Sequence, residues 1–294
     1  PGSPGWTQTI TANASQQKPK ADQDSASLAA RTDANQHLTI EVRINGMGPY
    51  RFVVDTGAER SVIAENVATA LGLLQGGSVI LEGIGGRVRV PTVHVDTLSF
   101  GPFRRDGLNL PILPRSNLFA DGYLGLDAIN GTRVTFDFGR HVLNIEQPLG
   151  HLSAEGADEA NVRARGNNGR LRVFDCMVNS VGAIAFIDTG AEVSVGNQAL
   201  YNKLISRNHS LESFANAVLT GVTGGTITGE LIHIYRIRMR DLSFTDGTLV
   251  IADVPDFSIW KIKEDRPALL IGMDYLRQFA SVSIDYRYKE ILFE

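Results

Sequence analysis

Alternation of apolar and polar residues predicts β-strands over much of the chain. Residues 38–44 alternate in this way, which is typical of a strand with one buried face. Asn45-Gly46 then predicts a tight turn into a second strand at residues 50–54, which ends abruptly at Asp55. Residues 64–73 have the spacing of a short helix. The first part of the chain is therefore expected to be mostly β-structure.

A glycine-rich turn joins the next two expected strands. Residues 83–86, Gly-Ile-Gly-Gly, lie between the apolar runs at 79–81 and 88–90. No helix pattern follows these glycines, so they do not have the context of a phosphate-binding loop. Two strands with a flexible tip have the form of a hairpin that can cover a cleft, and we call this hairpin flap 1. Further strands are expected at residues 93–100 and 142–145.

The second half of the chain repeats the first. The run Asp-Thr-Gly-Ala-Glu at residues 55–59 returns at residues 188–192, again at the end of an apolar run. The pattern of residues 134–138 returns at 282–286. A second glycine-rich turn at residues 221–226 matches flap 1, and we call its hairpin flap 2. The distance between matching positions only grows along the chain, as loop insertions in the second copy would produce.

This repetition predicts an all-β fold of two lobes, built from one duplicated lobe with short helices. The N-terminal lobe is expected at residues 37–146 and the C-terminal lobe at 171–294. Residues 147–170 are rich in Gly, Ala, Asn and charged residues and are expected to link the lobes. Residues 1–36 form a polar arm or linker that precedes the body.

The two repeated aspartates, Asp55 and Asp188, are the candidate catalytic residues. A carboxylate at the end of a buried strand needs hydrogen-bond donors or a partner charge. A duplicated lobe can place its two copies face to face across a pseudo-twofold axis. Two carboxyl groups in contact share one proton, so one can activate a water while the other polarises a carbonyl group. The pair therefore favours peptide hydrolysis without a metal, a cofactor or a covalent intermediate.

These motifs resemble those of the aspartic proteases, from about Leu38 to Glu294. Ala58 and Ala191 follow the Asp-Thr-Gly runs as in retroviral proteases, and both halves carry a flap candidate. The chain thus looks like a single-chain, tandem retropepsin-like protease of bacterial type. The resemblance implies a catalytic pair and supporting loops, formed by Asp55, Thr56, Gly57, Ala58, Gly125, Asp188, Thr189, Gly190, Ala191 and Gly272.

The flaps and the two acids after the repeated motifs are expected to contact substrate. These residues are Gly83, Ile84, Gly85, Gly86, Val222, Thr223, Gly224, Gly225, Glu59 and Glu192. Retroviral enzymes carry an arginine after the glycine of the second active-site segment, where this chain has Leu126 and Met273. The pairing of that arginine with an acid is therefore not expected here.

An extended polypeptide is the expected substrate, with apolar side chains favoured weakly at the cut. Pockets for them are expected from Val62, Ile63, Val193, Val195 and Ile84. The alternative is a protease-fold module that holds a peptide without cutting it. Both aspartates and both threonines are present, which favours the enzyme.

Composition narrows the remaining possibilities. The chain is 43% hydrophobic and 20% charged, as in soluble globular proteins. Its formal charge of −4 shows no excess of basic residues, so nucleic acid is not an expected partner. Cys176 is the sole cysteine, so no internal disulfide can form. We expect a monomer, because one chain supplies both aspartates. The polar arm suits a periplasmic or membrane-tethered setting in a bacterium, and Trp6 and Ile10 could dock it in its own cleft or a neighbour's.

Overall fold

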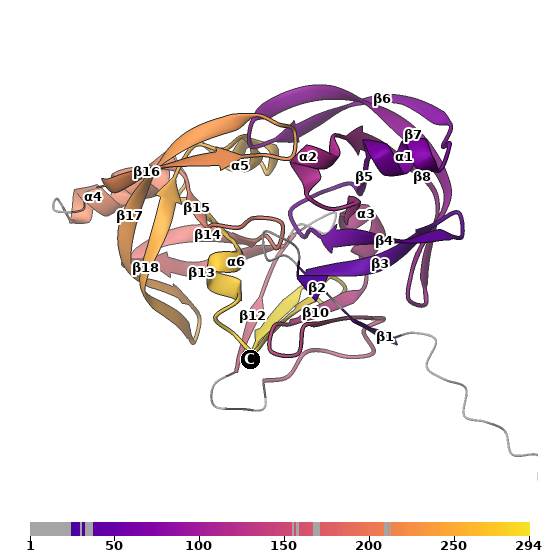
Figure 1. Cartoon of the computed structure of the whole chain (residues 1–294). Helices are drawn as coiled ribbons and strands as arrows, with labels where there is room; N and C mark the ends of the chain where they lie inside the picture. The colour runs from indigo at the N-terminus through magenta and orange to yellow at the C-terminus, as the bar shows by residue number, and fades with distance from the viewer. Residues whose placement is uncertain are drawn as a thin grey trace, which may run out of the picture.

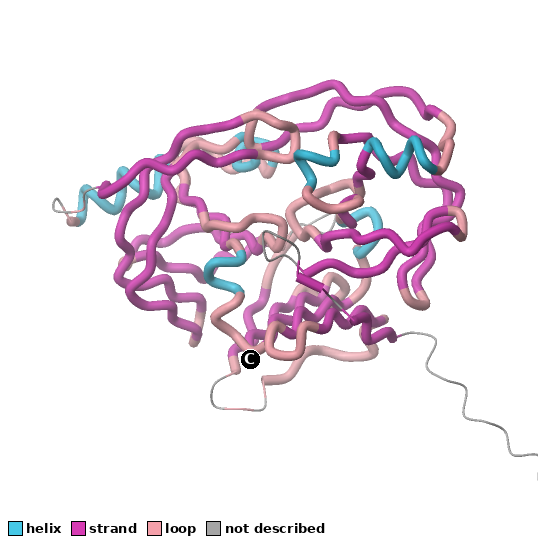
Figure 2. The backbone as a smooth tube through the Cα atoms, viewed as in Figure 1, coloured by secondary structure: helices cyan, strands magenta, loops and turns pink. Residues whose placement is uncertain are grey.

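A computed structural model of the chain describes residues 25–29, 31–32, 38–154, 156, 159–166, 171–208, 211 and 213–294. The described part of the chain is mostly β-strand, arranged as two lobes that stand on a shared base sheet (Figure 1). The tube view shows only short helical segments among the strands (Figure 2). The prediction of an all-β, two-lobed fold is therefore confirmed.

The sheet of the N-terminal lobe has the strand order β2-β3-β4-β9-β5-β8-β7-β6, and β3 also pairs with β7, so that the sheet curls onto itself. Its core is apolar, with Phe52, Ile63 and Leu110 fully buried. The strands are β2 (Arg31–Thr32), β3 (Leu38–Ile44), β4 (Met47–Val54), β5 (Val62–Ala64), β6 (Gln75–Gly83), β7 (Gly86–Phe100), β8 (Phe103–Leu113) and β9 (Gly122–Leu124).

The sheet of the C-terminal lobe repeats this arrangement with the order β13-β14-β19-β15-β18-β17-β16 and an added β13–β17 pairing. In both lobes the strand that leads to the Asp-Thr-Gly run pairs in parallel with a later strand, β4 with β9 and β14 with β19. The strands are β13 (Arg172–Val178), β14 (Val181–Ile187), β15 (Val195–Gly196), β16 (Ser213–Thr220), β17 (Thr226–Met239), β18 (Leu242–Ile251) and β19 (Ala268–Ile271).

Short helices fill the connections between these strands. The one expected at residues 64–73 is shorter, because Gly72 adopts a positive φ of 57° soon after its last turn. The helices are α1 (Glu65–Ala70), α2 (Arg115–Leu118), α3 (Leu126–Ile129), α4 (Gln198–Arg207), α5 (Pro255–Ile259) and α6 (Met273–Leu276).

The base sheet joins the two lobes, in the order β1-β11-β10-β20-β21-β12. At its centre β10 and β20 are antiparallel, and Thr135 lies opposite Ser283, its counterpart in the repeat. Their hydroxyl oxygens lie 2.7 Å apart. Matching residues that pair around one point are the sign of a twofold axis. The strands are β1 (Ser25–Ala29), β10 (Arg133–Asp137), β11 (Val142–Glu146), β12 (Ala160–Arg163), β20 (Ser281–Asp285) and β21 (Glu290–Phe293).

Two segments expected to lie outside the lobes contribute strands to these sheets. Within residues 147–170, the expected linker, β12 pairs with β21. Within the expected arm, β1 pairs with β11 and β2 with β3. Trp6 and Ile10, the expected docking residues of the arm, lie outside the described residues.

A buried ion pair ties the two halves together in the base sheet. Arg133 of β10 reaches Asp285 of β20 at 2.8 Å and Glu146 of β11 at 2.9 Å. The side chain of Asp285 is 0% exposed and that of Arg133 is 14% exposed. Breaking a buried pair by removing one partner leaves the other charge uncompensated, which is strongly destabilising.

We therefore expect Arg133→Ala to lower the free energy of unfolding by about 3–5 kcal/mol. Arg140 is the matched control, because its side chain is 84% exposed and lies 3.7 Å from Asp137. Arg140→Ala should change stability by less than about 1 kcal/mol, as exposed ion pairs do. Urea unfolding of the three proteins measures both values, and equal losses for the two variants would contradict a stabilising role of the buried pair.

Candidate active site

The two repeated aspartates end strands that lead to the interface between the lobes. Asp55 follows β4 and its backbone N–H donates to the Leu124 carbonyl at 2.9 Å. Asp188 follows β14 and donates in the same way to the Ile271 carbonyl at 2.9 Å. Each aspartate is thus held against the strand that precedes the second active-site segment of its own lobe, β9 or β19.

Backbone donors of the turn after each aspartate hold its carboxylate. The N–H groups of Gly57 and Ala58 donate to Asp55 Oδ1 at 2.8 and 3.0 Å. The N–H of Gly190 donates to Asp188 Oδ1 at 2.9 Å. These bonds fix the carboxylates and favour their charged form. They supply the donors that a carboxylate at the end of a buried strand requires.

The turn glycines place the two carboxyl groups against each other's loops. A Cβ atom added at Gly57 would lie 2.5 Å from Asp188 Oδ2, and one added at Gly190 would lie 2.5 Å from Asp55 Cγ. Because Gly57 also donates to Asp55, both carboxyl groups meet at this one residue. Any side chain at position 57 or 190 would displace a carboxylate, so glycine is required by close approach.

Thr56 and Thr189 lock the two loops together by reciprocal hydrogen bonds. The Thr56 hydroxyl donates to the Ile187 carbonyl at 3.0 Å, and the Thr189 hydroxyl donates to the Val54 carbonyl at 2.7 Å. Each hydroxyl also accepts from the other threonine's N–H, at 3.0 and 3.2 Å. Both side chains are buried. The crosswise bonds fix the separation of the two strands that deliver the aspartates.

A second pair of ties, which sequence reasoning missed, joins the loops within each lobe. Ser61 donates to Asp127 through its N–H at 2.8 Å and its hydroxyl at 2.6 Å, and its hydroxyl accepts from the Gly125 N–H at 3.1 Å. In the other lobe Ser194 donates to Asp274 at 3.0 and 2.6 Å and accepts from the Gly272 N–H at 2.9 Å.

The residues of these Ser–Asp ties stand at matching positions in the two halves of the chain, so comparison of the halves could have identified them. Ser61 and Ser194 stand at matching positions after the two Asp-Thr-Gly runs, and Asp127 and Asp274 end the matching Gly-Leu-Asp and Gly-Met-Asp runs. They connect the same two segments in each lobe, beside Leu126 and Met273, both of which are buried. Glycine at 125 and 272 is again a packing requirement, because an added Cβ would approach backbone atoms within 3 Å.

Tyr286 is a further residue that sequence reasoning did not single out. Its side chain is buried, and its hydroxyl has no hydrogen-bond partner in the part of the chain that the structure describes. Burial raises the pKa of this hydroxyl well above its usual range, and the charges of Asp55 and Asp188 raise the pKa further. The matching residue of the first lobe is Phe138, so the surroundings of the two aspartates are not symmetric.

A cavity of about 290 Å³ lies between the aspartates and the flaps. Of the residues expected to bind substrate, Glu59, Gly83, Ile84, Val222 and Thr223 line it. The remaining lining residues are Asp55, Gly57, Ala58, Arg60, Val62, Ile80, Leu81, Glu82, Tyr123, Asp188, Gly190, Ala191, Thr220, Gly221 and Leu270. Thr223 also places in this region a buried hydroxyl that has no partner among the described residues.

Other expected contact residues lie elsewhere. Glu192 is exposed and does not line the cavity, so the two repeated glutamates have different surroundings. Ile63 and Val195, expected in pockets, are buried in the core at 0% and 2% exposure. Val193 is 37% exposed and is likewise not a lining residue. Alternation along β5 and β15 is too short to tell a core residue from a pocket residue.

Of the remaining expected glycines, Gly85 and Gly225 lie where the flap tips meet. Gly224 lies against Asn117, and Gly86 has a positive φ of 109° with no atom within 4 Å of an added Cβ. Gly85 of flap 1 and Gly225 of flap 2 approach so closely that a Cβ on either would collide with backbone atoms of the other. A Cβ at Gly221 would lie 3.2 Å from backbone and side-chain atoms of Ile84. Figure 1 shows the two hairpins meeting above the centre of the molecule. The cleft is therefore closed by both flaps.

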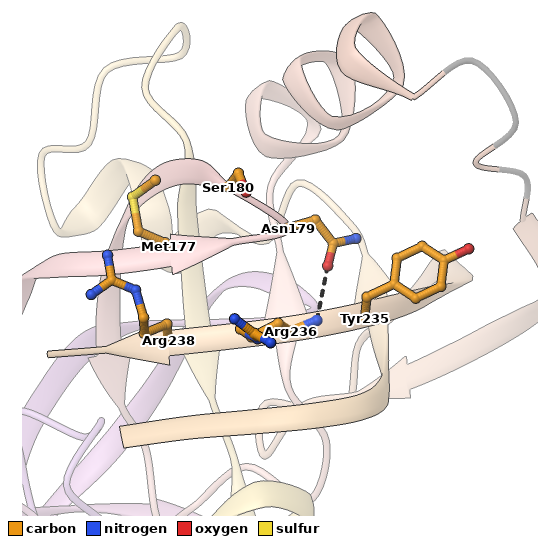
Figure 3. Close-up of a pocket in the computed structure, with 6 residues that line it drawn as sticks. All are labelled: Met177, Asn179, Ser180, Tyr235, Arg236 and Arg238. Atoms are coloured by element: carbon orange, nitrogen blue, oxygen red, sulfur yellow. Dashed lines mark hydrogen bonds between the residues drawn. The ribbon is translucent and has the colours of Figure 1, made fainter. Parts of the chain in front are cut away.

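A second hollow, of about 400 Å³, lies on the C-terminal lobe away from the lining residues of the cavity. Figure 3 shows Arg236 and Arg238 on β17 beside the turn that carries Asn179 and Ser180. Asn179 Oδ1 accepts from the Arg236 backbone N–H at 2.9 Å. Arg236, Arg238 and Arg240 are exposed, so this face of β17 is solvated.

Cys176, His94 and His233 do not line the cavity between the aspartates and the flaps. Burial raises the pKa of the Cys176 thiol to about 12, so this cysteine acts as a small buried residue. His94 and His233 are exposed. No group of His, Cys, Asp or Glu suited to a metal occurs among the described residues, and none of the described helices is long and apolar enough to cross a membrane.

The Ser–Asp ties generate a prediction about pH. Burial raises the pKa of Asp127 and of Asp274, although hydrogen bonds from Ser61 and Ser194 act in the opposite direction. A raised pKa in the folded state means that folding favours the protonated acid. The stability from these groups is thus full below the unfolded pKa, about 4, and is lost as the pH rises through the folded value.

We expect the free energy of unfolding of the parent protein, relative to the Asp127→Asn/Asp274→Asn variant, to fall as the pH rises from about 4. Urea unfolding at several pH values measures this difference. The control is Asp246→Asn, whose side chain is 87% exposed and which should give a nearly constant difference. A difference that rose with pH for the double variant would contradict the assignment.

Comparison with family models finds a similarity in the N-terminal lobe. Residues 40–128 match the family model of an aspartyl protease. The match spans the greater part of the N-terminal lobe and includes Asp55, Ser61, flap 1 and Asp127. No curated protein matches the chain. The matched region supports an aspartyl protease family and a peptidase activity.

Proposed function

We propose that the chain is a metal-independent aspartic endopeptidase whose catalytic pair is Asp55 and Asp188. The observation that carries the proposal is the meeting of both carboxyl groups at Gly57 and Gly190, beneath a cavity that residues of both flaps line. The family match at residues 40–128 supports it from the sequence of the N-terminal lobe alone. The repeated motif and the reciprocal threonine bonds extend the same arrangement to the C-terminal lobe.

The proposed reaction is the addition of water to a peptide carbonyl. The ionised carboxylate takes a proton from the water, and the water oxygen bonds to the carbonyl carbon. The protonated carboxyl group of the pair donates a hydrogen bond to the carbonyl oxygen. The tetrahedral intermediate then collapses: the carboxyl group that took the proton from the water passes it to the nitrogen, and the C–N bond breaks. The pair returns to one ionised and one protonated carboxyl group. Backbone donors from Gly57, Ala58 and Gly190 hold the carboxylates in position throughout.

The substrate is proposed to be an extended polypeptide. The cavity is lined by residues of two β-hairpins, whose backbones can pair with an extended chain. Val62, Ile80, Leu81 and Leu270 offer apolar lining, which favours apolar side chains beside the cut bond. The proposal assigns to the Thr223 hydroxyl, which has no partner among the described residues, a hydrogen bond to a substrate carbonyl.

Substitution of either aspartate tests the proposal directly. Asp55→Asn and Asp188→Asn should each reduce kcat/KM for a peptide by roughly 10²–10⁴-fold or more, because each removes an acid–base group. Asp246→Asn, at an exposed site, should leave activity unchanged. Cleavage of a peptide library, read by mass spectrometry, supplies the substrate. A parent protein that binds peptides and cuts none would instead be a binding module.

The pH profile should be centred in the mildly acidic to neutral range. Ala58 and Ala191 follow the two Asp-Thr-Gly runs and have no hydroxyl to donate to the carboxylates. A carboxylate with fewer donors is less stabilised in its charged form. Initial rates on one peptide from pH 2 to pH 8 measure the profile, and activity confined to pH near 2 would contradict this expectation.

Activity should belong to the monomer. One chain supplies both aspartates and both flaps, so specific activity should stay constant as the enzyme is diluted. Sedimentation or light scattering over the same concentrations reports the oligomeric state. A steep fall in specific activity, with the fold retained, would show that the active species is a dimer.

A further inference from the structure

The two flaps are not held in the same way. Asn117 of α2, in the N-terminal lobe, donates through Nδ2 to the Val222 carbonyl at the tip of flap 2, at 3.2 Å. A Cβ added at the neighbouring Gly224 would lie 3.0 Å from the same Nδ2 atom, so the flap tip rests directly on this amide. This hydrogen bond crosses between the lobes and joins helix α2 of the N-terminal lobe to the tip of flap 2.

The support under Asn117 is rigid. The next residue, Leu118, is 0% exposed and anchors α2 in the core of the N-terminal lobe. The Asn117 backbone N–H donates to the Pro114 carbonyl at 3.0 Å, which closes the turn. The Ser116 hydroxyl donates to Asn117 Oδ1 at 3.4 Å, and this contact directs the Nδ2 side of the amide toward flap 2.

Flap 1 has no matching bond among the described residues. The equivalent helix of the C-terminal lobe, α5, contacts β6 of flap 1. Of the α5 side chains that the structure describes, the one with a hydroxyl, Ser258, donates within its own helix, to the Pro255 carbonyl at 2.8 Å, and not to flap 1. The tip of flap 1 contacts flap 2 through Gly85 and Gly83, the latter beneath Thr223.

We infer that Asn117 is a positioning residue that holds flap 2 closed over the cleft, so that flap 1 is the flap that opens to admit substrate. Flap 2 places Gly221, Val222 and Thr223 along the cavity, and the bond from Asn117 fixes this wall before substrate arrives. Flap 1 is held by packing of its tip against flap 2 and of β6 against α5. Among the side chains that the structure describes, no hydrogen bond from the C-terminal lobe ties its tip, so flap 1 can lift at a lower cost than flap 2. The role of Asn117 in catalysis rests on the proposed function, whereas its hold on flap 2 does not.

Hydrogen exchange followed by mass spectrometry tests the hold on flap 2. In the parent protein the tip of flap 1 should exchange faster than the tip of flap 2, because local opening costs less there. Asn117→Asp keeps the shape of the side chain and removes its donor. It should speed exchange in flap 2 by roughly two- to tenfold, the range expected for one lost hydrogen bond.

Asn202→Asp is the matched control. Asn202 lies on α4, is exposed, and pairs with Gln198 at 3.1 Å. This variant should leave both flaps unchanged. Unchanged exchange of flap 2 in Asn117→Asp, or an equal increase in both flaps, would overturn the proposal.

Kinetics with a cleaved peptide add a second readout. Asn117→Asp should raise KM by roughly threefold to tenfold and change kcat less, because a loosened flap weakens binding without touching the aspartates. A fall in kcat with KM unchanged would contradict a role in substrate binding. If the chain proves not to cleave peptides but flap 2 still loosens in this variant, the proposed function fails and the assignment of Asn117 stands.

Discussion

The crosswise hydrogen bonds of Thr56 and Thr189 are the constraint on which the arrangement of the site depends. Each hydroxyl is buried, donates to a carbonyl of the opposite lobe and accepts from the opposite threonine's N–H. Buried polar groups keep such bonds because losing one partner leaves the other unsatisfied in a dry environment. The strands that end at the two aspartates can therefore adopt only one separation.

The threonine bonds join the two lobes at the aspartates, and the base sheet joins them at a second place. The pairing of Thr135 with Ser283 centres the sheet on the same pseudo-twofold axis, and the Arg133–Asp285 ion pair joins β10 to β20. The Ser61–Asp127 and Ser194–Asp274 ties then hold each active-site loop against the second segment of its own lobe. Glycine at positions 57 and 190 is a consequence, since no side chain fits between loops held this close.

The residues around the cavity and the flaps do not keep the pseudo-twofold symmetry of the two lobes. Arg60 lines the cavity in the first lobe, while its counterpart Val193 does not. Tyr286 lies within electrostatic reach of both aspartates, while its counterpart is Phe138. Asn117 holds flap 2 and flap 1 lacks a similar bond within the described residues. The proposed substrate, a peptide, has direction, and a cleft with two different halves is compatible with binding it in one direction.

The repeat explains how much could be predicted from the sequence. Alternation and duplication predicted the lobes, the flaps and the position of both aspartates, because period-two patterns and repeated motifs are local signals. The Ser–Asp ties were also within reach, since Ser61 and Asp127 have counterparts at matching positions. Asn117 and Arg133 were not, because each acts on a partner far along the chain and no local pattern marks it. Ile63 and Val195 were expected in pockets and are buried in the core, because short strands do not reveal which face is buried.

The central claim is that Asp55 and Asp188 act as one pair, and the titration of their carboxyl groups tests it most directly. Carbon-13 labelling of aspartate, with assignment by the Asn variants, allows the Asp55 carboxyl signal to be followed against pH in the parent protein and in Asp188→Asn. Two carboxyl groups that share a proton cannot titrate independently, so removal of Asp188 should move the pH at which Asp55 titrates. An Asp55 signal that titrates at the same pH with and without Asp188 would contradict the account.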